Sequence, residues 1–170
     1  MAASKRSKGA KGKQEAGAGG DRTVATNRRA RYDYEISETY EAGIALVGSE
    51  VKSLRAGNVQ LQDAYARVED GEVWLHGMHV KPYEFAGKYV PDPDRKRKLL
   101  LHRGEIDELV GVTAQTGVTL VPMRLYFKRG LAKLELGVGR GKRRYDKRRT
   151  IAERDAAREA ERAIKERSWR

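Results

Sequence analysis

Short apolar runs separated by tight-turn signals limit the fold of this 170-residue chain more than any other feature. Two pairs of runs are joined by hairpin signals, at Asp70-Gly71 and at Lys128-Arg129-Gly130. Nowhere do strands alternate with long helical segments in the way that builds a parallel sheet. The pattern therefore predicts antiparallel strands connected by hairpins. Closure of such a sheet into a barrel is favoured because it leaves no edge strand with unpaired backbone groups.

We expect a mainly β protein: an OB-like small antiparallel β-barrel with flanking short helices and a flexible basic C-terminal tail. An open α+β sheet is the alternative. The expected strands are 32–36, 41–47, 64–69, 73–80, 118–127 and 131–138, and the expected helices follow Ser49 and span 105–110. Gly43, inside a strand, indicates a bulge or a close backbone approach. Ser49 is expected to cap its helix, and Gly57 to end it.

The excess positive charge lies at the two ends of the chain. Residues 1–31 and 140–170 each carry a net charge of +7, whereas residues 32–139 carry −2. This distribution is typical of a protein that docks on a polyanion such as nucleic acid; solvated tails that only aid solubility are the alternative. We expect a disordered basic arm at 1–25, a folded RNA-binding barrel at 26–138, and a basic tail at 139–170. That tail has a capping box at Thr150–Glu153 but only a thin apolar stripe, so it should be disordered alone and helical when bound.

Composition excludes several classes of protein. The chain has no Cys, which removes disulfides and thiolate chemistry. It has no apolar run long enough for a signal peptide or a membrane span, so we expect a soluble, cytoplasmic protein without membrane partners. His76 and His79 are three apart on a predicted strand and face opposite sides, so no metal site is expected. The glycines near Lys142 lack the spacing of a phosphate-binding loop. No positioned nucleophile is recognisable, and we predict neither an enzyme nor a cofactor.

Two groups of charged residues permit more than one interpretation. Glu41 and Glu50 are either solvated acids or acceptors for the amino groups of RNA bases. The basic run 95–98 precedes an apolar segment that ends at His102. It is either a solvated loop or an edge that clamps an RNA backbone beside a stacking or hydrogen-bonding histidine.

Five blocks of the sequence, in order, resemble the SmpB family of bacterial SsrA-binding proteins. They are Asn27-Arg-Arg-Ala-Arg31, Tyr40-Glu-Ala-Gly-Ile-Ala-Leu46, Glu50-Val-Lys-Ser-Leu-Arg-Ala-Gly57, Arg97-Lys-Leu-Leu-Leu-His102 and Gly141-Lys-Arg-Arg-Tyr-Asp-Lys-Arg148. The resemblance implies an OB-like barrel that binds the tRNA-like domain of transfer-messenger RNA (tmRNA, or SsrA RNA). It also implies that the protein takes the place of the missing anticodon arm and delivers this RNA to stalled ribosomes for trans-translation. The expected partners are tmRNA and the stalled ribosome, with the protein itself a monomer.

The same resemblance assigns two sets of site residues. The expected RNA-binding residues are Asn27, Arg28, Glu41, Lys98, Leu100 and His102. Some relatives have Asn in place of His102, and both side chains can form hydrogen bonds. The residues expected at the ribosomal decoding centre are Gly141, Lys142, Arg143, Asp146, Lys147 and Arg148, where Arg143 replaces the usual lysine. Two other functions fit the composition: a general single-strand RNA module, with Tyr65, Trp74, Tyr83 and Tyr126 as candidate stacking residues, and an RNA-processing enzyme.

Overall fold

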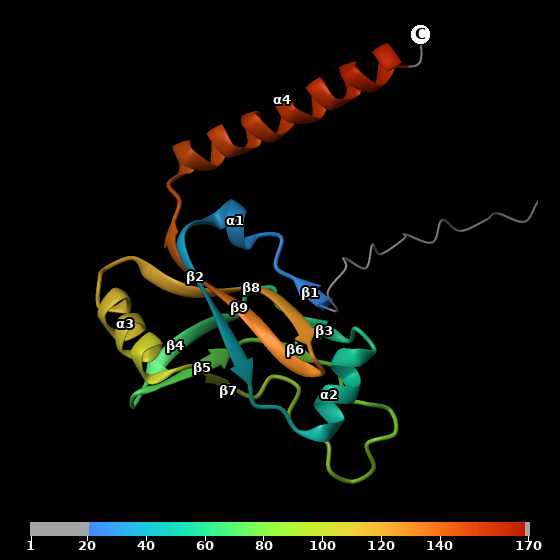
Figure 1. Cartoon of the computed structure of the whole chain (residues 1–170), viewed down its shortest axis with the longest axis vertical. Helices are drawn as coiled ribbons and strands as arrows, with labels where there is room; N and C mark the ends of the chain where they lie inside the picture. The colour runs from blue at the N-terminus through green and yellow to red at the C-terminus, as the bar shows by residue number, and fades with distance from the viewer. Residues whose placement is uncertain (1–20, 169–170) are drawn as a thin grey trace, which may run out of the picture.

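The computed structural model describes residues 21–168 (Figure 1). Its strands are β1 (Arg22–Thr26), β2 (Tyr34–Ile44), β3 (Val59–Gln60), β4 (Tyr65–Glu69), β5 (Glu72–His76), β6 (His79–Val80), β7 (Arg97–Leu100), β8 (Val118–Lys128) and β9 (Leu131–Gly141). Its helices are α1 (Ala30–Asp33), α2 (Gly48–Arg55), α3 (Arg103–Thr113) and α4 (Arg144–Ser168). Within 21–168, no helix combines the length and the apolar character needed to cross a membrane. Most of the arm predicted at 1–25 lies outside the described residues.

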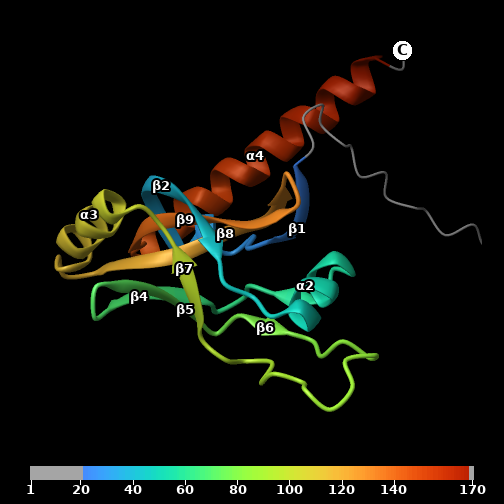
Figure 2. The ribbon, with the colours of Figure 1, turned by 60° about the horizontal axis from the view of Figure 1, so that its bottom comes forward.

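Seven strands form one antiparallel sheet in the order β1-β8-β4-β5-β7-β2-β9, and β8 also pairs with β9. The pairing of β8 with β9 joins the sheet into a near-closed ring (Figure 2). Strand β8 pairs with β9 along one edge and with both β1 and β4 along the other. The contact between β4 and β8 is the shortest, with Ala66 opposite Leu120 as its single register pair. The mainly β, antiparallel architecture with flanking helices is confirmed.

Alternation of apolar and polar residues builds the core inside the ring. The inward-facing residues with the least exposure include Ala42, Val73, Leu75, Leu99, Leu125, Leu134 and Leu136. Both predicted hairpins are confirmed, because the two loop residues of each have positive φ, as type I′ turns require: 50° and 74° at Asp70-Gly71, 51° and 78° at Arg129-Gly130. These local turns set the register of β4 with β5 and of β8 with β9.

The predicted pair of strands at 32–36 and 41–47 is wrong in detail, because one strand, β2, covers Tyr34–Ile44. It pairs with β9 along almost its whole length and absorbs an irregularity between Ile36 and Glu38. Tyr32 lies in α1 instead of a strand. The close approach predicted at Gly43 is confirmed, since a Cβ there would lie 3.2 Å from the Cβ of Leu100 on β7.

Helix starts differ from the expected ones. The residue before α2 is Val47, not Ser49, and its backbone N–H donates to the Glu50 carboxylate at 3.0 Å. Gly57, with φ of 79°, ends this helix as predicted. Helix α4 begins at Arg144, ahead of the expected start near Thr150, because the Asp146 carboxylate accepts the Arg143 N–H at 3.3 Å. An acidic acceptor inside the first turn can replace a capping residue in front of it.

Strand β1 begins at Arg22, within the segment assigned to the disordered arm. Its backbone pairs with β8, and Val24 and Ala25 pack against the core. This strand was not predicted, because two small apolar residues are a weak strand signal and its partner strand lies about a hundred residues later in the chain.

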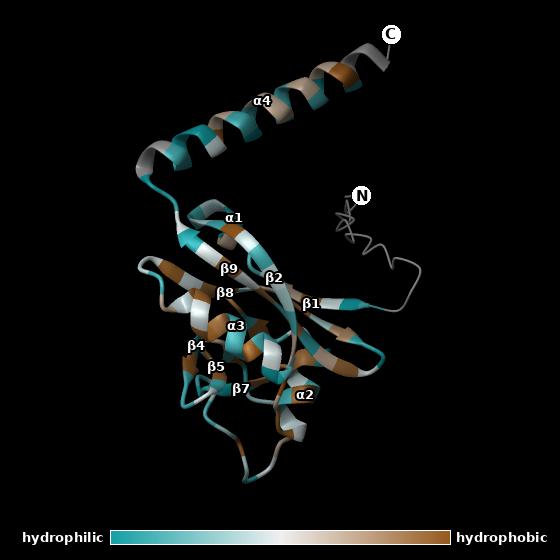
Figure 3. Cartoon of the chain, turned by 60° about the vertical axis from the view of Figure 1, so that its left-hand side comes forward, coloured by the Kyte–Doolittle hydropathy of each residue, from teal (hydrophilic) through white to brown (hydrophobic). Residues whose placement is uncertain are grey.

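The body has two distinct ends. Tyr34 pairs with Gly141 at one end of the β2–β9 ladder, and Gly43 pairs with Lys133 at the other. At about 3.3 Å per residue the ladder separates these ends by roughly 30 Å. Helices α1 and α4 lie at the first end, whereas the irregular segment between β6 and β7, the 81–96 loop, projects from the opposite end (Figures 1 and 3).

Candidate nucleic-acid interface

Three of the predicted RNA-binding residues meet in one open groove of about 540 Å³. Glu41 lies on β2, Leu100 at the end of β7, and His102 directly before α3. Strands β2 and β7 are neighbours, with Gly43 opposite Leu100, so residues nearly sixty positions apart share one wall. The groove is at the end of the body opposite α4.

Glu41 is the best-positioned acceptor in this groove. Its Oε2 accepts a hydrogen bond from the Tyr126 hydroxyl at 2.5 Å and lies 3.0 Å from Nζ of Lys128. These two contacts, the Tyr126 bond first, hold the pKa of Glu41 below its ordinary value, so the group is a carboxylate at neutral pH. Burial and the same bond raise the pKa of Tyr126, which is 3% exposed. Because the Glu41 side chain is 39% exposed, it can also accept bonds from a ligand.

The rest of the groove combines an apolar wall with a few polar groups. Leu100 and Leu131, which both line the groove, are 53% and 63% exposed. His102 is also exposed, and its backbone N–H donates to the Glu105 carboxylate at 2.9 Å, which fixes the start of α3. Lys133 adds a cation to the lining. Apolar surface, an acceptor, an imidazole and a cation together suit an RNA segment with accessible base edges.

Lys98 lies beside the groove but not in it. Lys98 and Leu100, two residues apart on β7, both point to the outer face of the sheet. Lys98 forms an ion pair with Glu72 on β5 and lies opposite Trp74 in the sheet. On the same outer face, Nζ of Lys96 lies 4.7 Å from the centre of the Trp74 ring. Lys98 is therefore a partly exposed, ion-paired cation on the outer face of the sheet next to the groove.

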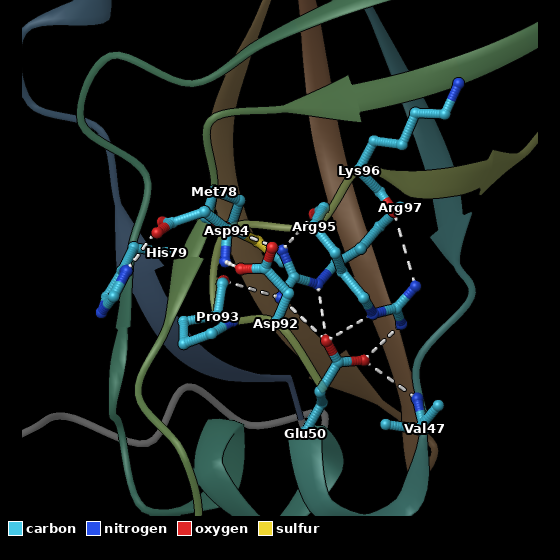
Figure 4. Close-up of polar contacts among 10 residues, drawn as sticks. All are labelled: Val47, Glu50, Met78, His79, Asp92, Pro93, Asp94, Arg95, Lys96 and Arg97. Atoms are coloured by element: carbon cyan, nitrogen blue, oxygen red, sulfur yellow. Dashed lines mark hydrogen bonds and ion pairs between the residues drawn. The ribbon is translucent and has the colours of Figure 1, made fainter. Parts of the chain in front are cut away.

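The basic run 95–98 divides into two faces, and Figure 4 shows Lys96 directed away from Glu50. Arg95 and Arg97 turn toward Glu50, with Nη2 to carboxylate oxygen distances of 2.5 Å and 2.8 Å. Arg97 is 0% exposed and also donates to the carbonyls of Met78 at 2.7 Å and Pro93 at 3.0 Å. The two arginines thus brace the interior, and the interpretation of the whole run as an RNA-clamping edge is wrong for them. The two lysines lie on the outer face, where each forms an ion pair with an acid, Lys96 with Glu69 and Lys98 with Glu72.

Glu50, left undecided by the sequence, is a buried structural anion with 2% exposure. Burial acts to raise its pKa, but hydrogen bonds from Arg95 and the Val47 backbone, and the charge of Arg97, outweigh this effect and lower the pKa. The ion-pair cluster ties α2 to the segment that leads into β7. It therefore positions Lys98 and Leu100 without contacting the groove.

Asn27 and Arg28 do not join the groove. The Asn27 amide donates to the carbonyls of Pro122 at 3.2 Å and Leu61 at 3.4 Å, and its backbone N–H donates to Met123 at 2.8 Å. These bonds give Asn27 a structural role at the turn between β1 and α1. Arg28 is exposed at the same turn.

The residues predicted for the decoding centre lie at the base of α4. Nζ of Lys147 lies 2.9 Å from the Asp33 carboxylate, and Nζ of Lys142 donates to the carbonyl of Arg31 at 3.0 Å. These contacts fasten the beginning of α4 to α1. Four members of the set are exposed beside this attachment: Gly141, Arg143, Asp146 and Arg148.

Leu131 and Lys133 line the groove, and Tyr126 and Lys128 hold the Glu41 carboxylate in place. None of the four was assigned to this site from the sequence, although Tyr126 was among the candidate stacking residues. All four belong to the β8–β9 hairpin. Only the register of β2 with β9 brings that hairpin to Glu41. The candidate stacking residues differ in exposure, with Tyr65 41% exposed on an outer face and Tyr126 buried.

Comparison with known proteins places the chain in a family. A family model described as "SmpB protein" matches residues 24–166. The "SsrA-binding protein" of Geobacillus sp. (strain WCH70) is 56% identical over 149 residues, covering 88% of this chain and 96% of the relative. The "SsrA-binding protein" of Acetivibrio thermocellus is 57% identical over 145 residues, covering 85% of this chain and 94% of the relative.

A solved structure agrees with these matches. A chain from "tmRNA-SmpB: a journey to the center of the bacterial ribosome" is 54% identical, has a TM-score of 0.61, and is aligned over 75% of this chain and 93% of its own length. The family model spans most of the sequence, including the groove and most of α4. The chain therefore belongs to the SmpB family.

Proposed function

We propose that this protein binds the tRNA-like domain of tmRNA and delivers it to stalled ribosomes for trans-translation. The observation that carries the proposal is the groove that unites Glu41, Leu100 and His102 at one end of the body, in a chain of the SmpB family. The protein acts as a binding adaptor in the bacterial cytoplasm and makes no covalent bond.

The two ends of the body support a division of labour. The groove takes the tRNA-like domain at one end, and the decoding-centre residues begin α4 at the other. The β2–β9 ladder between them acts as a spacer of roughly 30 Å. We propose that this rigid body, an OB-like barrel in class, replaces the anticodon arm that the RNA lacks. Lys98 supplies an auxiliary contact beside the groove, and the exposed Arg28 supplies one at the turn whose shape Asn27 maintains.

The tail is proposed to change its state on binding. Every side chain from Ile151 to Lys165 is exposed, and the surface of α4 is mainly hydrophilic (Figure 3). A helix without a packed face is marginal in water, so the tail unfolds readily and refolds along ribosomal RNA. An mRNA already present would compete for the same channel, which makes binding conditional on an empty one.

Glu41→Arg tests the groove. The substitution should weaken binding to the tRNA-like domain about tenfold or more although it adds positive charge, because it removes an acceptor and leaves the Tyr126 hydroxyl unpaired. The measurement is a titration of labelled tRNA-like domain at fixed salt.

Asp107→Arg is the matched control, since it makes the same charge change on an exposed residue of α3 outside the groove. It should leave binding unchanged or slightly tighter. Tighter binding by Glu41→Arg would show that the groove is only electrostatic surface and would remove the support for the proposal.

A further inference from the structure

The 81–96 loop displays aromatic side chains that the fold does not use. Phe85 is 82% exposed and Tyr89 is 92% exposed, and Val90 and Val47 beside them are also largely exposed. A soluble monomer rarely concentrates so much apolar surface at one place without a binding role.

The base of this loop is fixed by several polar contacts. The Val80 N–H donates to the Pro93 carbonyl at 3.0 Å, and Nδ1 of His79 lies 2.8 Å from the Asp94 carboxylate. The buried Arg97 also donates to the Pro93 carbonyl (Figure 4). The base of the loop is therefore held against the body, and the tip that carries Phe85 and Tyr89 projects from it.

The tip and α2 enclose a second groove of about 590 Å³. Tyr83, Phe85 and Tyr89 line it from the loop, and Val47 and Lys52 line it from α2. The rings of Tyr83 and Phe85 meet edge to face at 5.6 Å, and Nζ of Lys52 lies 5.4 Å from the centre of the Tyr83 ring. None of the lining residues, all within the described part of the chain, is acidic.

Aromatic faces beside a cation, with no carboxylate in the lining, match the chemistry of an unpaired nucleotide. The rings stack on the base, and the lysine neutralises the phosphate. Lys88, exposed at the loop tip between the two most exposed aromatics, adds a second cation. A purely apolar protein partner would not need these cations, and a basic one would be repelled by them.

The second groove adjoins the first. Ile44 lines the groove of Glu41, and Val47, three residues further along the chain, lines the groove of the loop. The first groove is at the Gly43–Lys133 end of the ladder, and the loop that lines the second projects from the same end, away from α4 (Figure 1). One RNA can therefore occupy both grooves.

We propose that Phe85 and Tyr89, with Lys52, form a stacking site for unpaired nucleotides of the same tRNA-like domain that occupies the first groove. This inference rests on the proposed function, because the RNA that it assigns to the stacking site is the RNA of that function. It extends the contact surface onto a loop in which the only residue predicted to stack was Tyr83, a candidate of the alternative RNA module.

The test is the affinity of the full chain for the tRNA-like domain of tmRNA, measured by fluorescence anisotropy at fixed salt. Phe85→Ser with Tyr89→Ser should weaken binding about tenfold or more, because stacking of even one base contributes that much. Phe85→Trp with Tyr89→Trp, which keeps the stacking surfaces, should restore it. Ile164→Ser, at an apolar position on α4 that is 69% exposed, should have no effect.

Each outcome has a distinct meaning. If the wild type binds the RNA and the double serine variant binds equally well, the stacking site is wrong and the proposed function stands. If the wild type does not bind, the proposed function itself fails. Unchanged RNA affinity together with a shift from dimer to monomer in the serine variant would assign the loop to a second copy of the chain and overturn the inference.

Discussion

Glu50→Ala is expected to lower the free energy of unfolding by about 3–5 kcal/mol, the cost of leaving a buried charge without its partner. Glu50 is 2% exposed, and the guanidinium that it neutralises, Arg97, is fully buried. Removing the carboxylate leaves the Arg97 charge in the interior beside Arg95. Urea denaturation at neutral pH measures the change, and the midpoint should fall with an unchanged slope.

Glu72→Ala is the matched control, because Glu72 also pairs with a basic residue of the same segment, Lys98, but is 41% exposed. Its loss should cost less than about 1 kcal/mol. Since the folded-state pKa of Glu50 is lowered, its contribution is complete above the unfolded pKa and is lost as pH falls through the folded one. Wild type and Glu50→Gln should therefore converge in stability at acid pH. Equal effects of Glu50→Ala and Glu72→Ala would contradict this account of the cluster.

Deletion of residues 142–170 is expected to abolish peptide tagging on stalled ribosomes while leaving affinity for the tRNA-like domain within about threefold at moderate salt, where distant charges are screened. The cut leaves β9 complete, because Gly141 still pairs with Tyr34. The groove, at the far end of the ladder, keeps all of its lining residues. Tagging is measured by translation of an mRNA without a stop codon in the presence of tmRNA.

Two triple variants of the full chain separate specific contacts from charge. Each variant replaces one acid and two basic residues by alanine and so removes a net charge of +1. The first changes Asp146, Lys147 and Arg148, and the second changes Asp155, Arg158 and Arg162. The first should lose tagging and the second should keep most of it. Equal loss in both would mean that the tail acts by charge alone. An equal loss of RNA affinity and tagging on deletion would refute the division of labour between the two ends.

Local chemistry made part of the fold predictable. The turns at Asp70-Gly71 and Arg129-Gly130 each have glycine at the second loop position, where φ is positive, and both occur where expected. Gly43 predicted a close approach of a neighbouring strand, because glycine is otherwise disfavoured in the interior of a strand. The start of α2 was missed because the side chain of Glu50, inside the helix, takes the role expected of Ser49.

The site was less predictable because its contacts are long-range. Glu41 contacts Tyr126 only when β2, β9 and β8 are in register, which no local pattern specifies. Arg95 and Arg97 carry the same charge as their lysine neighbours, and only the alternation of β7 toward a buried acid separates their roles. The exposure of Phe85 and Tyr89 likewise depends on what the loop packs against.

The most direct measurement of the central claim is a gel shift of the purified protein with the tRNA-like domain of tmRNA, in the presence of excess ordinary tRNA. The account predicts a shift that survives the competitor, because contacts to base edges and RNA shape in the groove distinguish one RNA from another, whereas phosphate contacts do not. A shift that ordinary tRNA removes would contradict it and leave only a general basic RNA-binding module.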